Sequence, residues 1–65
     1  MNNNYKFIDR LCGIIYQVTS PDRVIPKEGQ IVTVGYKEYE VCMVDETINF
    51  DNFSRNITIY LNDLN

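Results

Sequence analysis

Shortness is the property that most constrains the fold of this chain, which has only 65 residues. A domain of this size buries a small share of its surface, so its hydrophobic core alone supplies little stability. Domains this small usually depend on a disulfide, a bound metal or association with another chain. Which of these three the sequence can supply therefore bears on both fold and function.

A disulfide is not the expected stabiliser. The chain begins Met1-Asn2-Asn3-Asn4, without the basic and apolar segments of a secretory signal. It has no apolar run approaching the roughly 20 residues that cross a bilayer. We therefore expect a cytoplasmic protein with no membrane partner. Thiols stay reduced in that compartment, so Cys12 and Cys42 are predicted to be buried apolar residues and not a bridge.

Metal binding and catalysis are not expected either. Histidine is absent, which removes the usual general base and the commonest metal ligand. A structural zinc site needs about four Cys or His ligands, and the chain has two cysteines. Asp45, Glu46 and Asp51 lack the ligand spacing of a calcium-binding loop, and the separated glycines form no phosphate-binding loop. We expect no enzyme, no catalytic residue, no metal site and no cofactor.

The charge distribution argues against a nucleic-acid partner. The formal net charge is −3, and the six lysines and arginines are scattered along the chain. Binding to a phosphate backbone needs clustered cations. The composition is otherwise that of a folded domain, with 45% hydrophobic and 23% charged residues.

The best-defined element is a hairpin with a glycine turn. Residues 30–34 and 38–44 are short apolar runs, and Gly35-Tyr36-Lys37 joins them. Two such runs on either side of a glycine turn predict a β-hairpin. Alternation places Tyr39, Val41 and Met43 on one face of its second strand.

A long connection and a closing strand are predicted to follow. Residues 45–56 are mostly polar, and a connection of this length in so small a domain is typical of a functional or mobile loop. Residues 56–61 alternate cleanly, which predicts a strand with Ile57, Ile59 and Leu61 facing the core and Thr58 and Tyr60 facing out.

The first apolar segment, residues 5–19, leaves two alternatives open. The spacing of several apolar residues fits one face of a helix; they are Phe7, Leu11, Ile14, Ile15 and Val18. Gly13 and the run Ile14-Ile15-Tyr16 favour a strand. We expect a strand over residues 13–19, with Ile14, Tyr16 and Val18 on one face. Residues 5–12 are either a second strand or a short helical turn, and residues 1–4 and 62–65 are expected to be frayed.

The span of residues 25–61 resembles very small phage and bacterial proteins with an Ile-Pro-x-x-Gly entry, a Val-rich strand, a glycine turn and a Tyr-x-Val strand. The matching residues are Ile25, Pro26, Gly29, Val32, Gly35, Tyr39, Val41, Val44, Ile57, Ile59 and Leu61. The resemblance implies an SH3-like or similar small β-barrel. Together with the strand pattern, it predicts a single, mainly β domain: a four- to five-stranded antiparallel meander, with a short N-terminal helix as the alternative for its start.

Aromatic and cationic residues outside the expected core are the candidate binding residues. They are Tyr36 at the hairpin turn, Lys37 beside it, Phe53 and Arg55 in the polar loop region, and Tyr60 on the outward face of the last strand. Aromatic side chains anchor protein partners and stack on bases.

Two functions are compatible with these residues. The first is an interaction protein that acts as a homodimer, since self-association is the stabiliser left once disulfide and metal are set aside. Phage origin would make it an inhibitor or adaptor of a host protein in the host cytoplasm. The alternative is a small-molecule binder that sequesters a nucleotide or cyclic nucleotide at a subunit interface.

Overall fold

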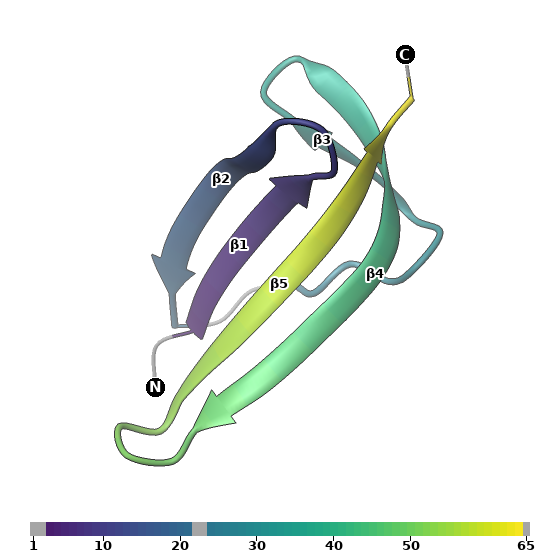
Figure 1. Cartoon of the computed structure of the whole chain (residues 1–65). Helices are drawn as coiled ribbons and strands as arrows, with labels where there is room; N and C mark the ends of the chain where they lie inside the picture. The colour runs from purple at the N-terminus through teal and green to yellow at the C-terminus, as the bar shows by residue number, and fades with distance from the viewer. Residues whose placement is uncertain (1–2, 22–23, 65) are drawn as a thin grey trace.

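The computed structural model describes residues 3–21 and 24–64 of the chain. They form five strands: β1 (Asn3–Asp9), β2 (Gly13–Ser20), β3 (Ile31–Val34), β4 (Lys37–Asn49) and β5 (Ser54–Asp63). The strands make one curled sheet in the order β2-β1-β5-β4-β3 (Figure 1). The prediction of a mainly β chain is confirmed, and the described residues contain no helix.

The predicted antiparallel meander is wrong at the centre of the sheet, because β1 runs parallel to β5. The other neighbouring strands are antiparallel. The parallel pair sets Tyr5 beside Ile57 and Phe7 beside Ile59. Alternation along a strand shows which side chains face the core, but it does not identify the neighbouring strand.

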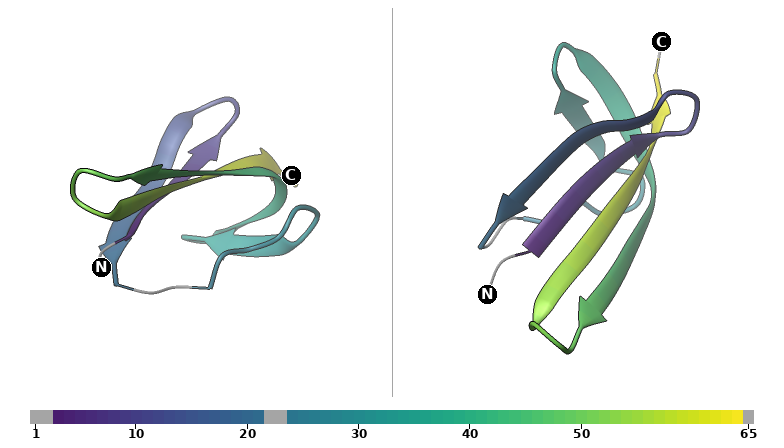
Figure 2. Two further views of the ribbon diagram at one scale, coloured as in Figure 1. Left: turned by 90° about the horizontal axis from the view of Figure 1, so that it is seen from below. Right: turned by 60° about the vertical axis from the view of Figure 1, so that its left-hand side comes forward.

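The sheet curls into a half-barrel with a concave inner face and a convex outer face (Figure 2). The hydrophobic core lies on the inner face and consists of Tyr5, Phe7, Tyr39, Val41, Ile57, Ile59 and Leu61. Ile57, Ile59 and Leu61 of β5 are each 0% exposed. The prediction that these three side chains face the core is confirmed, and so is the predicted burial of Tyr39.

The predicted hairpin of residues 30–44 is confirmed as β3 and the first part of β4. Its register pairs Ile31 with Glu40 and Val34 with Lys37. The turn needs a left-handed backbone at Gly35, whose φ is 65°, and glycine adopts that conformation without a steric cost.

The predicted long polar loop at residues 45–56 is wrong. β4 continues to Asn49, and β5 begins at Ser54. The connection is therefore only residues 50–53. Residues 45–49 pair with residues 54–58 in register, so the backbone hydrogen bonds of this polar segment are satisfied within the ladder. The part of a strand that extends beyond the core has no face packed against it. Its residues therefore do not alternate between apolar and polar, and the sequence pattern does not predict a strand there.

A β-bulge at Cys42 reverses the faces of β4. Val41 lies opposite Leu61 on the inner face, whereas Met43 lies opposite Tyr60 on the outer face. The prediction that Met43 shares a face with Tyr39 and Val41 is therefore wrong. One extra residue in a strand shifts every later side chain to the other face.

A second irregularity lies in the pairing of β1 with β2. Phe7 pairs with Tyr16 but Ile8 pairs with Ile14, so Ile15 is the extra residue. Ile14 thus lies on the outer face, and its predicted alignment with Tyr16 and Val18 is wrong.

The ends of the chain are more ordered than expected where they are described. Asn3 and Asn4 belong to β1, and Asn62 and Asp63 belong to β5, so the predicted fraying is wrong for these four residues. Residues 1–2 and 65 lie outside the described part. Residues 5–9 are strand, which removes the helical alternative.

The cysteines are less buried than predicted. Cys12 is exposed in the turn between β1 and β2, Cys42 is half-buried at the bulge, and both are free. The small core therefore has to stabilise the described fold without a cross-link.

We expect replacement of Ile59 by alanine to unfold most of the protein at 25 °C. A buried Ile→Ala change costs about 2–5 kcal/mol, and domains of this size rarely have more than about 3–5 kcal/mol of stability. Thr47→Ala, on the exposed outer face of β4, is the control and should change stability by less than about 0.5 kcal/mol. Urea unfolding followed by circular dichroism measures both, and equal midpoints for the two variants would contradict this core.

Candidate binding groove

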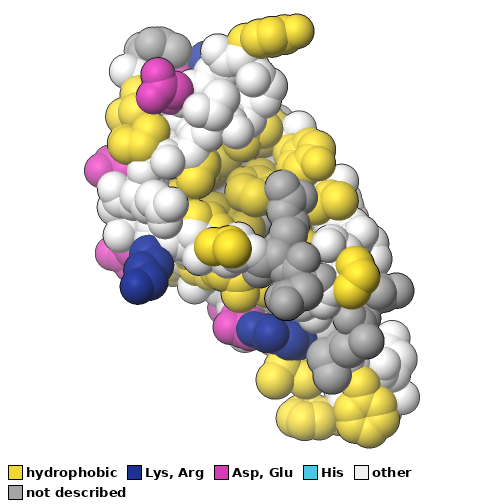
Figure 3. All heavy atoms as spheres, turned by 180° about the vertical axis from the view of Figure 1, so that it is seen from behind, with side chains coloured by type: hydrophobic (Ala, Val, Ile, Leu, Met, Phe, Trp, Pro, Cys, Tyr) yellow, Lys and Arg dark blue, Asp and Glu magenta, His cyan; other side chains and the backbone are white. Residues whose placement is uncertain are grey.

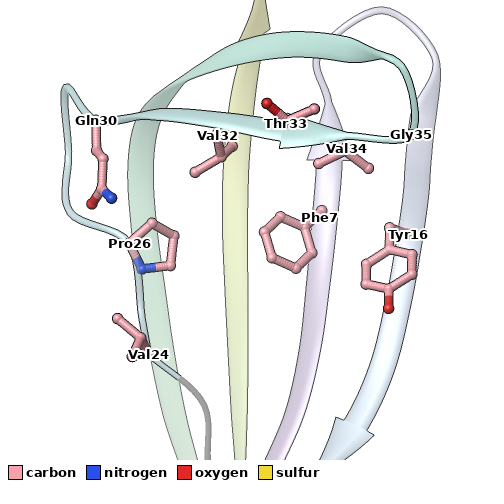
Figure 4. Close-up of a pocket in the computed structure, with 9 residues that line it drawn as sticks. All are labelled: Phe7, Tyr16, Val24, Pro26, Gln30, Val32, Thr33, Val34 and Gly35. Carbon is pink, nitrogen blue, oxygen red and sulfur yellow. The ribbon is translucent and has the colours of Figure 1, made fainter.

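The inner face of the half-barrel contains an open groove of about 460 Å³ between the edge strands β2 and β3 (Figure 4). It is lined by Phe7, Tyr16, Val24, Pro26, Gln30, Val32, Thr33, Val34 and Gly35. From this side, hydrophobic side chains gather in the middle of the molecule (Figure 3). The core therefore continues into a surface that the described residues leave open.

The floor and walls of the groove come from three strands and from the connection between β2 and β3, which contributes Val24, Pro26 and Gln30. Phe7 of β1 and Tyr16 of β2 are paired in register, and their ring centroids lie 5.8 Å apart at an interplanar angle of 51°. Val32 and Val34 occupy alternate positions of β3, so both project from the same face and pack against the core. Figure 4 shows the two valines facing the two rings across the groove.

The groove is bordered by the two edge strands of the described sheet. β2 and β3 are the two ends of the sheet order, so each has hydrogen-bonded neighbours on one side only. An edge strand presents unpaired N–H and C=O groups that can pair with a further extended chain. An apolar groove beside such an edge can accept alternate side chains of the same chain.

The chemistry of the lining is apolar. None of its described side chains carries a charge. The side-chain Oε1 of Gln30 accepts a hydrogen bond from the backbone N–H of Lys27 at 3.0 Å, so this amide is already engaged within the chain. Among residues 3–21 and 24–64 no three His, Cys, Asp or Glu side chains are grouped to hold a metal ion.

The five residues predicted to bind a partner lie in three separate places, and none lines the groove. Tyr36 and Lys37 are at the β3–β4 turn, where Tyr36 is fully exposed. Lys37 donates a hydrogen bond to Asp63, which raises the pKa of its ammonium group, and it lies 5.9 Å from the centroid of the Tyr39 ring.

The other three predicted residues are on β5 or at the tip of the β4–β5 hairpin. Tyr60 is half-buried on the outer face in the second half of β5. Arg55 forms an ion pair with Glu46 across the hairpin, and Phe53 is in the turn beyond it. Phe7, Tyr16, Val32 and Val34 were missed because their pattern is that of core residues, and no sequence signal indicates that the space between β2 and β3 stays open.

The tip of the β4–β5 hairpin is hydrophobic. Ile48, Phe50 and Phe53 are 52%, 76% and 64% exposed, and hydrophobic side chains gather at this end of the molecule in Figure 3. The side-chain oxygen of Asn49 accepts from the N–H of Asp51 at 3.0 Å. The side-chain oxygen of Asn52 accepts from the N–H and the hydroxyl of Ser54, at 3.1 and 2.7 Å. These bonds fix the turn that presents the aromatic rings.

Phe53 occupies a backbone conformation that suits glycine or asparagine better. Its φ is 56°, in the left-handed region, which costs an ordinary residue about 1–2 kcal/mol. The ring is largely exposed, so burial does not offset this strain. Neither backbone conformation nor packing accounts for a phenylalanine here.

We expect Phe53→Asn to leave the protein as stable as the wild type or to stabilise it by up to about 1 kcal/mol, because asparagine tolerates the left-handed region. Phe50→Asn is the matched control, since it removes a comparably exposed ring at a position without positive φ. Thermal unfolding of the two variants measures the difference. A loss of more than about 1 kcal/mol for Phe53→Asn alone would mean that its ring packs against the hairpin.

Comparisons of the chain with models of protein families, with curated proteins and with solved structures found no match. The described residues include no helix that is long and apolar enough to span a membrane. The features of this chain that indicate a function are the groove, the edge strands beside it and the exposed surfaces.

Proposed function

We propose that this chain is a small, non-enzymatic interaction protein that acts as a homodimer and binds an extended apolar segment of a protein partner. The binding site in this proposal is the groove between β2 and β3. The observation that carries it is a space of about 460 Å³, uncharged in its described lining, directly beside the two edge strands of the described sheet. Its volume is within the range of about 300–1,000 Å³ typical of ligand sites.

The dimensions of β3 limit what the groove can hold. Four residues of strand extend over about 13 Å, and side chains on one face recur about every 6.8 Å. A bound segment running along β3 can thus place about two successive side chains between the valines of β3 and the rings of Phe7 and Tyr16. Each buried apolar side chain contributes about 1.5–3 kcal/mol before the cost of association. Two such side chains give at most about 6 kcal/mol, less than the roughly 8 kcal/mol that a micromolar dissociation constant requires. We therefore propose weak binding of a short segment, with dissociation constants of about 100 μM or above.

The biological setting in this proposal follows the resemblance of residues 25–61 to very small phage and bacterial proteins. In this setting the chain is an inhibitor or adaptor that acts on a host protein in the cytoplasm. The SH3-like description of the barrel belongs to the same proposal, since the curled sheet supports only a half-barrel of mixed strand directions.

One observation favours a second candidate, the binding of a nucleotide or cyclic nucleotide. The tilted ring pair of Phe7 and Tyr16 opens onto the groove, and aromatic rings stack on bases. The described lining contains no lysine or arginine for a phosphate group, which makes an apolar peptide segment the better match.

Selection from a random peptide display library tests the proposed groove. We expect the selected peptides to alternate apolar and polar residues and to bind weakly, with dissociation constants of about 100 μM or above. Val34→Asp, which puts a charge inside the groove, should weaken their binding at least about tenfold because the charge would lose its hydration there. Ile48→Asp adds the same charge on the exposed hairpin tip and should leave binding unchanged.

Two outcomes would contradict the peptide proposal. One is equal binding of the selected peptides to both variants, with both shown by circular dichroism to be folded. The other is thermal stabilisation by nucleotides near millimolar concentration that is lost in Val34→Asp, which would support the second candidate instead.

A further inference from the structure

The outer face of the sheet carries one apolar row that crosses four strands. In the ladder, Ile14 lies opposite Ile8, Ile8 opposite Tyr60, and Tyr60 opposite Met43. We call these four residues the outer row. Ile14 and Met43 at its ends are 56% and 50% exposed, and Ile8 and Tyr60 between them are half-buried. The irregularities of β2 and β4 are what bring Ile14 and Met43 onto this face.

Most of the rest of the same face is polar. The next row along the strands is Gln17, Lys6, Thr58 and Asp45. The row beyond it is Thr19, Asn4, Asn56 and Thr47. In this third row Thr19 donates to the side chain of Asn4 at 2.9 Å, and Asn4 donates to that of Asn56 at 3.0 Å. Most of the face is therefore readily solvated. Ile31 of β3, which is 47% exposed, is a single apolar side chain elsewhere on this face, and the outer row is the apolar stretch that crosses several strands.

The charges of this face are divided between its two sides. Lys6 is on β1 and Asp45 is on β4, with β5 between them. Neither forms an ion pair with another residue in the described part of the chain. A surface that is cationic on one side and anionic on the other is complementary to a copy of itself turned by 180°.

We propose that the outer row is the interface of a homodimer whose two-fold axis runs parallel to the strands. This inference rests on the self-association in the proposed function and assigns it a surface. The axis sets β1 of one copy over β5 of the second, and β2 over β4. Ile14 then meets Met43 of the second copy, Ile8 meets Tyr60, and Lys6 lies within one strand spacing of Asp45.

The same charges disfavour the other face-to-face arrangement. A two-fold axis across the strands sets β1 of one copy over β1 of the other. Lys6 then faces a cation of the second copy, either its Lys6 or its Arg10, which reaches across the same face to Asn62. Like charges held together at an interface cost several kcal/mol.

The available area sets the strength of this dimer. Four strands are about 19 Å wide and seven residues of strand are about 24 Å long, so the face covers about 450 Å² per copy. About 900 Å² in total is an upper bound, because the face is convex, and it lies below the roughly 1,200–2,000 Å² of most specific interfaces. We therefore expect a weak dimer, with dissociation at micromolar or higher concentration. The groove is on the opposite face of the sheet, so each copy in the dimer keeps an open groove.

Sedimentation equilibrium between about 5 and 500 μM tests the interface. We expect the wild type to dimerise within this range, and Ile14→Lys or Met43→Lys to weaken the dimer at least about tenfold. Ile48→Lys is the control: it adds the same charge at a side chain of similar exposure on the hairpin tip, and it should leave the dimer unchanged.

A charge exchange identifies the orientation. Lys6→Asp and Asp45→Lys should each weaken the dimer, and the double variant should restore it, because the two side chains approach each other only across the proposed two-fold axis. Weak dimerisation of the double variant would overturn this axis. Circular dichroism and groove-peptide binding, expected to be unchanged in all of these variants, show that they are folded.

The outcomes separate this inference from the proposed function. A wild type that stays monomeric at 500 μM would overturn the outer-row interface and the proposed self-association together. A dimer weakened by Ile48→Lys but not by Ile14→Lys or Met43→Lys would assign self-association to the hairpin tip and overturn the outer row. Peptide binding to the groove is measured separately, and its outcome does not depend on either of these results.

Discussion

The parallel pairing of β1 with β5 is the interaction on which the rest of the structure depends. These two strands occupy the middle of the sheet and contribute five of the seven buried hydrophobic side chains: Tyr5, Phe7, Ile57, Ile59 and Leu61. β2 is attached to the sheet only through β1. β3 is attached only through β4, which in turn pairs with β5. Both walls of the groove are therefore held at their separation by one central ladder, and neither edge strand has a core of its own.

The extra residues in the β1–β2 and β4–β5 ladders determine which side chains lie on the outer face of the sheet. Without the extra residue at Ile15, the side chain of Ile14 would turn away from the outer row. Without the bulge at Cys42, Met43 would point into the core and Val44 out of it. The same two irregularities add twist to strands that flank the centre, and such twist is consistent with the curl that leaves β2 and β3 facing each other across the groove.

The fold was predictable from the sequence where alternation and turn chemistry coincide. The glycine turn at Gly35 and the alternation of Ile57, Ile59 and Leu61 were sufficient for the β3–β4 hairpin and for the inward face of β5. The partner of β1 was not predictable, because a parallel neighbour leaves no local mark on either strand. The polar half of β4 was missed because it extends beyond the core. The groove was missed because Phe7, Tyr16, Val32 and Val34 have the pattern of buried residues whether or not a further strand covers them.

The position of β5 at the centre of the sheet also determines when the chain can fold during synthesis. β1 pairs, on one side, with residues 52 positions further along the chain, as Asn3 does with Arg55. Until those residues have left the ribosome, the β1–β2 hairpin lacks the strand that covers Tyr5 and Phe7. An isolated two-stranded hairpin is at best marginally stable in water. Folding of this chain therefore has to wait for β5, and the high average separation between contacting residues imposes the slow rate of such topologies.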